Sequence, residues 1–296
     1  MKMDPFIEAE KVAGHSLKHC CELFEVSRAA FYQRRSDVPS VREVTDTELT
    51  ERITVVHAAS KGTYGSPRVH AELRRQGVTC GRRRVRRLMR RAGLEGRCTS
   101  RWNKTTIADP NSEAAKDLIE RHFGPCTELD RRYVGDITYI RTWEGWAYLA
   151  TVIDLASRRV VGWALADHMR TGLVQEALAR ALVTRRPDAG VIFHSDRGSQ
   201  YTSRQFATFA SQHGVTLSVS RTGNCFDNAV AESFFATIKR ELIDVHAWPT
   251  RERLRTAVFD YVEGWYNTRR LHSSLNYRSP ADYEAFINHH ADRQAA

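Results

Sequence analysis

Between residues 133 and 140 the chain reads Tyr-Val-Gly-Asp-Ile-Thr-Tyr-Ile. The run is rich in β-branched and aromatic residues, which predicts a β-strand that contains Asp136. An unpaired carboxylate among these apolar neighbours would be unfavourable, so Asp136 is expected to have a partner, for which a metal ion is the natural choice. The alternative interpretation places Asp136 at a solvent-exposed edge of the sheet.

Two further acidic residues have related positions. Asp196 ends the apolar run 191–196 and is expected at the carboxyl end of a sheet, where α/β proteins bind ligands, although a turn or helix-cap role is the alternative. Glu232 lies in the helical stretch 228–235. Carboxylates at strand ends and on a nearby helix can converge on one point. Two hard cations such as Mg²⁺ prefer oxygen ligands, and together they activate an attacking oxygen and stabilise a leaving one.

Other charged residues compete for a role in this site. Asp154 ends the second predicted strand and Asp227 precedes the helix, so either could support the site or be purely structural. Lys239 lies on the helical face of Glu232, about 10 Å farther along the axis. It is interpreted either as a contact to DNA phosphate or as an ordinary exposed lysine.

The positive charge of the chain is concentrated in one segment. The net charge is +10 and the pI about 9.5. Residues 61–104 contain fourteen Lys and Arg against two acidic residues, a net of +12, which leaves about −2 for the rest. This asymmetry predicts a dedicated nucleic-acid-binding module, and a solvated basic face without a partner is the alternative.

The basic segment has the pattern of three short helices over residues 45–96. A capping box is predicted at Thr45–Glu48, a second helix begins at Ser66-Pro67, and a third runs from Gly81 or Arg82 to Gly93. This is typical of a helix-turn-helix domain whose last helix enters the major groove. Arginine suits both phosphates and guanine edges, and which side chains read bases stays open. The predicted DNA-binding arginines are Arg82, Arg83, Arg84, Arg86, Arg87, Arg90 and Arg91.

The remaining pattern predicts an α/β protein with a mixed sheet flanked by helices. Strands are expected at 133–140, 146–155, 159–166, 191–196 and 216–220, with helices at 171–183 and 203–213. The predicted organisation is an N-terminal helical arm (1–44), the helix-turn-helix domain (45–96), a linker (97–128) with one helix within 109–123, and a catalytic core with a helical tail (129–296). The sequence shows no signal peptide, membrane span or C-x-x-C pair, which predicts a cytoplasmic protein without a membrane partner.

Four motifs together carry a family resemblance. They are Gly-Asp-Ile-Thr-Tyr (135–139), His-Ser-Asp-Arg-Gly-Ser-Gln-Tyr (194–201), Asp-Asn-Ala-Val-Ala-Glu-Ser-Phe-Phe (227–235), and a C-terminal set with Trp-Tyr-Asn (265–267), Arg-Leu-His-Ser-Ser-Leu (270–275) and Pro280. They resemble the Asp-Asp-Glu catalytic core of bacterial insertion-sequence transposases. In this group the integrase-like protein is encoded by the second of two overlapping reading frames. The group is related to retroviral integrases.

The resemblance implies a ribonuclease-H-like core that uses two Mg²⁺ ions, for which Mn²⁺ can substitute. Asp136, Asp196 and Glu232 would be the catalytic metal ligands, and Lys239 would contact the DNA end of the element. The implied reaction is nicking at the 3′ ends of the element, followed by attack of the freed 3′-hydroxyl on target DNA.

The resemblance also implies several partners. These are double-stranded DNA (the terminal inverted repeats and the target), further copies of the chain on DNA, and the product of the first reading frame as a fusion or association. The expected location is the bacterial cytoplasm, at the nucleoid. Two alternatives stay open: a catalytically inactive regulator that binds the element, and a ribonuclease-H-like nuclease that cuts without joining.

Overall fold

The predicted strand around Asp136 is β1, the central strand of a five-stranded sheet with the order β3-β2-β1-β4-β5. The computed structural model describes residues 3–35, 38–97, 128–188, 190–219 and 229–295. β2 and β3 continue the sheet antiparallel to their neighbours, whereas β4 and β5 run parallel. The bounds are Arg132–Thr142 for β1, Gly145–Asp154 for β2, Val160–Ala166 for β3, Val191–Ser195 for β4 and Val215–Val219 for β5. All five predicted strands are thus confirmed, and the core has the mixed-sheet α/β class that was expected.

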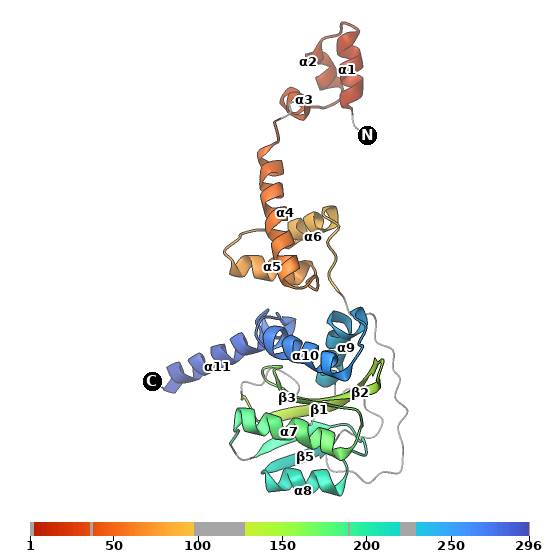
Figure 1. Cartoon of the computed structure of the whole chain (residues 1–296). Coiled ribbons are helices and arrows are strands. Elements are labelled where there is room, and N and C mark those ends of the chain that lie inside the picture. The colour runs from red at the N-terminus through yellow and green to blue at the C-terminus, as the bar shows by residue number, and fades with distance from the viewer. Residues whose placement is uncertain (1–2, 36–37, 98–127, 189, 220–228, 296) are drawn as a thin grey trace.

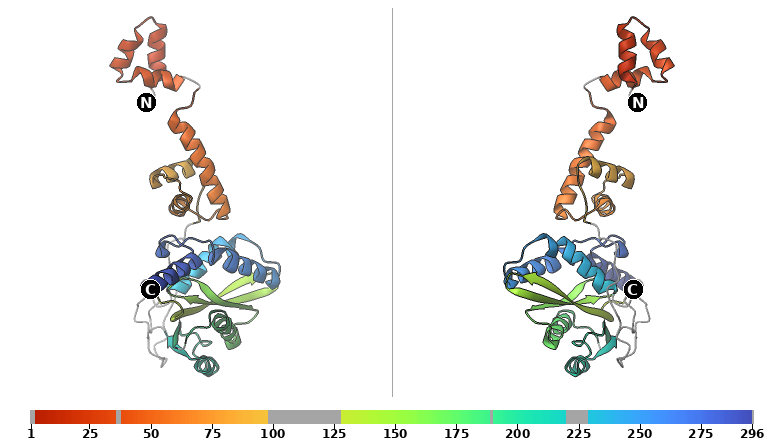
Figure 2. Two further views of the ribbon diagram at one scale, coloured as in Figure 1. Left: turned by 90° about the vertical axis from the view of Figure 1, so that its left-hand side faces the viewer. Right: turned by 90° about the vertical axis from the view of Figure 1, so that its right-hand side faces the viewer.

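Helices cover both faces of this sheet (Figures 1 and 2). One face carries α7 (Thr171–Arg185) and α8 (Arg204–Gln212), and the other carries α9 (Ala229–Glu241) and α10 (Arg251–Tyr261). Side chains alternate along β1, so Tyr133 packs in the cluster under α7 and α8 while Val134 packs in the cluster under α9 and α10. Asp136 therefore lies on the α9 side of the sheet.

Gly135 allows β1 and β4 to approach closely beside Asp136. A Cβ atom at Gly135 would lie 2.2 Å from Cζ of Phe193, so the aromatic ring occupies the space that a side chain would need. β4 pairs with β1 only over residues 132–134 of β1. Beyond Val134, this edge of β1 has no strand partner within the described ranges. Asp136 therefore lies on an unpaired part of the strand edge.

The N-terminal part consists of two groups of helices, arranged end to end with the core (Figures 1 and 2). The first group has its own small cluster, in which Ile7, Cys20, Cys21 and Phe31 are buried. The second group contains the predicted helix-turn-helix elements, including the arginine-rich third helix. The bounds are Asp4–Val12 for α1, Leu17–Leu23 for α2, Arg28–Arg35 for α3, Val41–Ala59 for α4, Ser66–Arg75 for α5 and Arg82–Arg91 for α6.

The predicted start of α4 was wrong by five residues, because the N-cap is Ser40 and not Thr45. The capping box is formed by Ser40 and Glu43: the Ser40 Oγ accepts from the Glu43 backbone N–H at 3.3 Å, and the Glu43 carboxylate accepts from the Ser40 N–H at 2.8 Å. Thr45 instead lies inside the helix, where its hydroxyl donates to the Arg42 carbonyl. Residues 98–127 of the predicted linker, including the helix expected within 109–123, lie outside the described residues.

The C-terminal motif, which includes Trp265–Asn267, packs on the sheet and forms hydrogen bonds with it. α10 continues as a π-helical turn over Val262–Tyr266, and 3-10 turns occupy Ile243–Val245 and Ser273–Leu275 before α11 (Pro280–Ala295). The Asn267 side chain accepts from the Val160 N–H at 3.0 Å and donates to the Val160 carbonyl at 2.9 Å. This pair of bonds satisfies the backbone at the first residue of β3. Within the described ranges, no helix is both long and apolar enough to cross a membrane.

The α4–α6 unit packs directly on this C-terminal segment. The Tyr64 hydroxyl donates to the Arg269 carbonyl at 3.2 Å and accepts from the Leu271 N–H at 2.8 Å. The Arg68 Nε donates to the Leu271 carbonyl at 2.9 Å. Arg97 donates to the carbonyls at the end of α9. These contacts hold the arginine-rich unit against the helix that bears Glu232.

Replacing Tyr64 by phenylalanine is expected to loosen this contact. The ring would still pack, but the Leu271 N–H would lose its partner, at a cost of about 1–3 kcal/mol. Hydrogen exchange measured by mass spectrometry should show faster exchange in peptides that contain Leu271, with peptides from β2 and β3 unchanged. Equal exchange in the two proteins would show that the hydroxyl does not hold the two parts together.

Candidate active site

Asp136 lies at the centre of a group of charged side chains between β1, β4 and α9. Its side chain is partly exposed, and its Oδ1 accepts from the Ile137 backbone N–H at 2.8 Å. Burial, and then the negative charge of Asp196, raises the pKa of Asp136 to about 7. The Glu232 carboxylate raises this pKa further, whereas the Ile137 hydrogen bond and the Lys239 charge lower it. Both other predicted carboxylates therefore act on Asp136.

Asp196 and Glu232 reach Asp136 from two other elements. Asp196 is exposed directly after β4, and its Oδ1 accepts from the Gly198 N–H at 3.0 Å, which fixes a tight turn. Glu232 lies in the first turn of α9, where Ala231, Phe234 and Phe235 are buried against the sheet. Burial raises the pKa of Glu232. Packing of α9 thus orients Glu232 toward β1.

The donor set fits a hard divalent cation, although the described side chains do not form a closed cage. Three carboxylates supply oxygen atoms alone, as Mg²⁺ prefers. No three His, Cys, Asp or Glu side chains in the described ranges stand close enough together to form a ready metal-binding group. Mutual repulsion of three negative groups favours such separation, and a cation among them would remove that repulsion. The metal-ligand role therefore stays a prediction that the donor chemistry supports.

Lys239 of α9 brings a positive charge close to this group. Its charge lowers the pKa of Asp136, and its Nζ lies 5.6 Å from the centre of the Tyr139 ring. The side chain thus extends along the open edge of β1, as expected for a residue on the helical face of Glu232. Its predicted contact with DNA stays a prediction.

Tyr201, which was not among the predicted site residues, lies close enough to Asp136 and Asp196 for their charges to act on it. Its ring is buried against Phe193 and Phe206. Burial raises the Tyr201 pKa well above its usual value, and the charges of Asp136 and Asp196 raise it further. The sequence feature that could have identified Tyr201 is its place at the end of the His194–Tyr201 motif. Tyr201 fills the space behind the carboxylates with a rigid ring.

Asp154 has a structural role. The carboxylate is fully buried and accepts from the Ser157 N–H, the Ser157 hydroxyl and the Asp130 N–H. Burial raises the Asp154 pKa to about 6. It therefore closes the turn between β2 and β3, away from the metal-ligand candidates. Asp227, the other competing aspartate, lies outside the described residues.

The arginines of α6 divide into two kinds. Arg84 and Arg87 bind Asp46 of α4, with N–O distances of 2.7 Å each. Hydrogen bonds from Arg87 and Arg84 hold the pKa of Asp46 below its ordinary value. These two arginines therefore connect α4 to α6, which gives them a structural role beside the predicted one. The other predicted arginines are exposed on α6: Arg82, Arg83, Arg86, Arg90 and Arg91.

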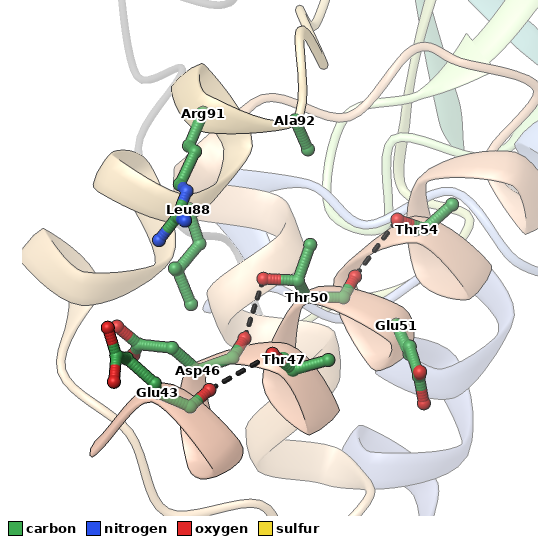
Figure 3. Close-up of a pocket in the computed structure, with 9 residues that line it drawn as sticks. All are labelled: Glu43, Asp46, Thr47, Thr50, Glu51, Thr54, Leu88, Arg91 and Ala92. Atoms are coloured by element: carbon green, nitrogen blue, oxygen red, sulfur yellow. Dashed lines mark hydrogen bonds between the residues drawn. The ribbon is translucent and has the colours of Figure 1, made fainter. Parts of the chain in front are cut away.

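A groove of about 640 Å³ separates α4 from part of α6 (Figure 3). Acidic side chains of α4 line it, among them Glu43, Asp46 and Glu51, together with Arg91 of α6. The threonines of its wall donate to carbonyls of their own helix, as Thr50 does to Asp46. Acidic groups repel phosphates, so this groove is a poor surface for DNA, and the exposed arginines of α6 away from it are better candidates.

The Asp136 pKa predicts a pH-dependent stability in metal-free solution. A folded-state pKa near 7, raised from the ordinary 3.8, means that the folded protein binds more protons than the unfolded chain between these values. The free energy of unfolding should thus fall as pH rises from about 4 to 7, by up to about 1.4 kcal/mol per pH unit. Denaturant unfolding between pH 5 and 7.5 should show a flatter dependence for Asp136→Asn. Identical slopes would contradict the raised pKa.

Three family models match parts of this chain. The Integrase core domain model matches residues 127–225, a second Integrase core domain model matches residues 213–280, and an HTH-like domain model matches residues 45–102. The sheet with Asp136 and the α9 segment with Glu232 both fall within the integrase-core matches. The chain thus combines an integrase core with an HTH-like domain.

Relatives over nearly the full length identify the family. The transposase for insertion sequence element IS904 of Lactococcus lactis subsp. lactis (strain IL1403) is 38% identical over 248 residues, covering 84% of this chain and 98% of the relative. Transposase InsF for insertion sequence IS3A of Escherichia coli (strain K12) is 36% identical over 285 residues, covering 94% and 97%. This chain belongs to the insertion-sequence transposase family.

Among solved structures, the HTLV-2 integrase catalytic core domain in complex with magnesium aligns with a TM-score of 0.39 and 15% identity. The alignment covers 53% of this chain and 97% of that chain.

Proposed function

We propose that the chain cuts the 3′ ends of its insertion sequence and joins them to target DNA at a site formed by Asp136, Asp196 and Glu232. The observation that carries this proposal is that Asp196, at the end of β4, and Glu232, on α9, lie close enough to Asp136 of β1 for their charges to act on it. Membership of the transposase family supplies the substrate class. The HTH-like match supports DNA as the partner.

In this proposal the three carboxylates hold divalent ions, two Mg²⁺ or Mn²⁺. When bound, such ions make an attacking oxygen more acidic and stabilise charge on the leaving oxygen. Asp136, which both other carboxylates influence, would hold such an ion together with Asp196 and Glu232. The fixed α9 presents Glu232, and Lys239 positions a DNA phosphate beside the site.

In this proposal, one set of residues binds DNA and another set holds the DNA-binding unit in place. The exposed arginines of α6 bind the terminal inverted repeat, and the contacts of Tyr64, Arg68 and Arg97 hold that unit in place relative to α9. Two ends must be joined in concert, so further copies of the chain assemble on DNA. The product of the first reading frame is a further proposed partner.

Product analysis on labelled DNA tests this function. Duplexes that carry the inverted repeats flanking the gene are incubated with the wild-type chain in Mg²⁺ or Mn²⁺, with and without the product of the first reading frame. The proposal predicts nicked ends and longer, joined products that both require metal. Nicked ends without joining, even with the first-frame product, would favour a nuclease. Binding with neither product would favour a regulator.

A further inference from the structure

The hairpin of β1 and β2 exposes three large aromatic side chains next to the candidate active site. Tyr139 is 62% exposed, Trp143 76% and Trp146 47%. We call these three residues the aromatic shelf. Trp143 and Trp146 are the two exposed tryptophans of the described ranges. Exposed groups of aromatic side chains of this size commonly mark a binding surface, so we expect the aromatic shelf to bind a partner.

The hairpin backbone that carries the aromatic shelf is held by Arg251 of α10 and by Trp248. Arg251 donates from Nε to the Trp146 carbonyl at 3.1 Å and from Nη2 to the Glu144 carbonyl at 2.8 Å. Its backbone N–H donates to the Glu144 carboxylate at 2.8 Å, and the Trp143 N–H donates to the Trp248 carbonyl. Tyr139 and Trp146 meet edge to face with their ring centres 5.3 Å apart. A surface that is already ordered loses little entropy when it binds a ligand.

Positive charge flanks the aromatic shelf. Lys239 lies over the Tyr139 ring, and the exposed Arg141 is the cross-strand neighbour of Trp146. The carboxylate nearest in sequence, Glu144, accepts the Arg251 N–H. Interfaces between protein copies are poor in lysine, whereas aromatic rings combined with basic residues are typical of surfaces that bind single-stranded nucleic acid.

The position of the aromatic shelf relative to Asp136 indicates which part of the DNA would bind to it. Tyr139 follows Asp136 by three residues on β1, so its side chain lies on the opposite face of the sheet, about 10 Å farther along the strand. This is close to three nucleotide steps of about 3.4 Å each. Lys239 influences both residues and so connects the aromatic shelf to the carboxylates. Asp136 is only partly exposed, and an unpaired strand approaches a recessed group more easily than a duplex does.

We propose that the aromatic shelf binds unpaired bases of the DNA end, about three nucleotides from the phosphate that is cut. Tyr139 and Trp146 stack on the bases irrespective of sequence, and Lys239 and Arg141 contact the adjoining phosphates. The inference rests on the proposed function, because it assigns a base-stacking role to a surface beside the proposed active site.

Binding of paired and frayed ends tests this proposal. The full-length chain with Asp136→Asn keeps the DNA intact, and two labelled duplexes of the terminal repeat differ only in whether the last three base pairs are matched. The frayed duplex should bind roughly 5- to 100-fold more tightly, as expected for stacking of one base. Adding Tyr139→Ala should remove most of this preference, whereas Tyr139→Phe should keep it. Phe259→Ala, at an exposed aromatic residue of α10, is the matched control and should also keep it.

The outcomes separate this proposal from the proposed function. Equal binding of paired and frayed ends, or a preference that survives Tyr139→Ala together with Trp146→Ala, would overturn the base-stacking role and leave the transposase activity intact. A change of oligomeric state on Trp146→Ala, with the frayed-end preference unchanged, would assign the aromatic shelf to contacts between copies and would also overturn it. Failure of the parent chain to prefer the terminal repeat over unrelated DNA would count against the proposed function itself.

Discussion

Replacing Asp136 by asparagine is expected to lower the yield of joined DNA by about a thousandfold or more. Asparagine keeps the size of the side chain and the oxygen that accepts the Ile137 N–H, but it removes the negative charge on which Asp196 and Glu232 act. Loss of supporting residues around a metal costs about 10- to 100-fold, and loss of a ligand should cost more. The measurement is strand transfer with labelled terminal-repeat duplexes under single-turnover conditions.

Asp154→Asn is the matched control for this substitution. It makes the same chemical change in the same sheet, at a buried carboxylate that accepts hydrogen bonds from Ser157. This variant should lose stability but keep its joining activity when assayed below its melting temperature. Asp136→Asn should bind terminal-repeat DNA as the wild type does. Wild-type joining by Asp136→Asn would remove Asp136 from the active site.

Replacing Arg270 by alanine is expected to destabilise the folded protein by about 3–5 kcal/mol, because it leaves a buried charge without its partner. Arg270 donates to both carboxylate oxygens of Glu241, with the shortest distance 2.8 Å, and the Tyr261 hydroxyl donates to the same group. Burial alone would raise the pKa of Glu241, but Arg270 holds it below its ordinary value. Thermal unfolding should show a decrease in Tm of roughly 6–20 °C.

A double variant separates the lost charge partner from lost packing. Glu241→Gln together with Arg270→Met removes both charges, so it should be markedly more stable than Arg270→Ala. Glu241 is also the last residue of α9, and its own backbone carbonyl accepts a hydrogen bond from Arg97. Arg270→Ala should therefore weaken attachment of the α4–α6 unit as well. A decrease in Tm of less than about 2 °C would show that the ion pair contributes little.

Local sequence patterns predicted the strands and α6 well because their signals are local. The β-branched and aromatic side chains over 133–140 favour an extended strand over other conformations. The start of α4 was missed because two stretches fit the same capping pattern. Both Ser40–Glu43 and Thr45–Glu48 have a hydroxyl residue three positions before a glutamate, and the helix uses the earlier one.

Features formed by distant residues could not be predicted from these patterns. The Tyr64 hydroxyl meets the backbone at Leu271, about two hundred residues away in sequence. Arg84 and Arg87 resembled the other α6 arginines until the fold placed Asp46 between them. The three candidate ligands were identified because each lies in a recognisable motif, whereas Tyr201 contributes through burial that the motif does not reveal.

The central claim is that segments around Asp136, Asp196 and Glu232 form one divalent-metal site. Cleavage of the polypeptide by radicals generated at bound Fe²⁺ tests it most directly, because the cuts occur beside the ion and carboxylates accept several divalent metals. The account predicts cuts near all three residues, suppressed by excess Mg²⁺ and absent in Asp136→Asn. Cuts confined to other parts of the chain, or cuts that persist unchanged in Asp136→Asn, would contradict it.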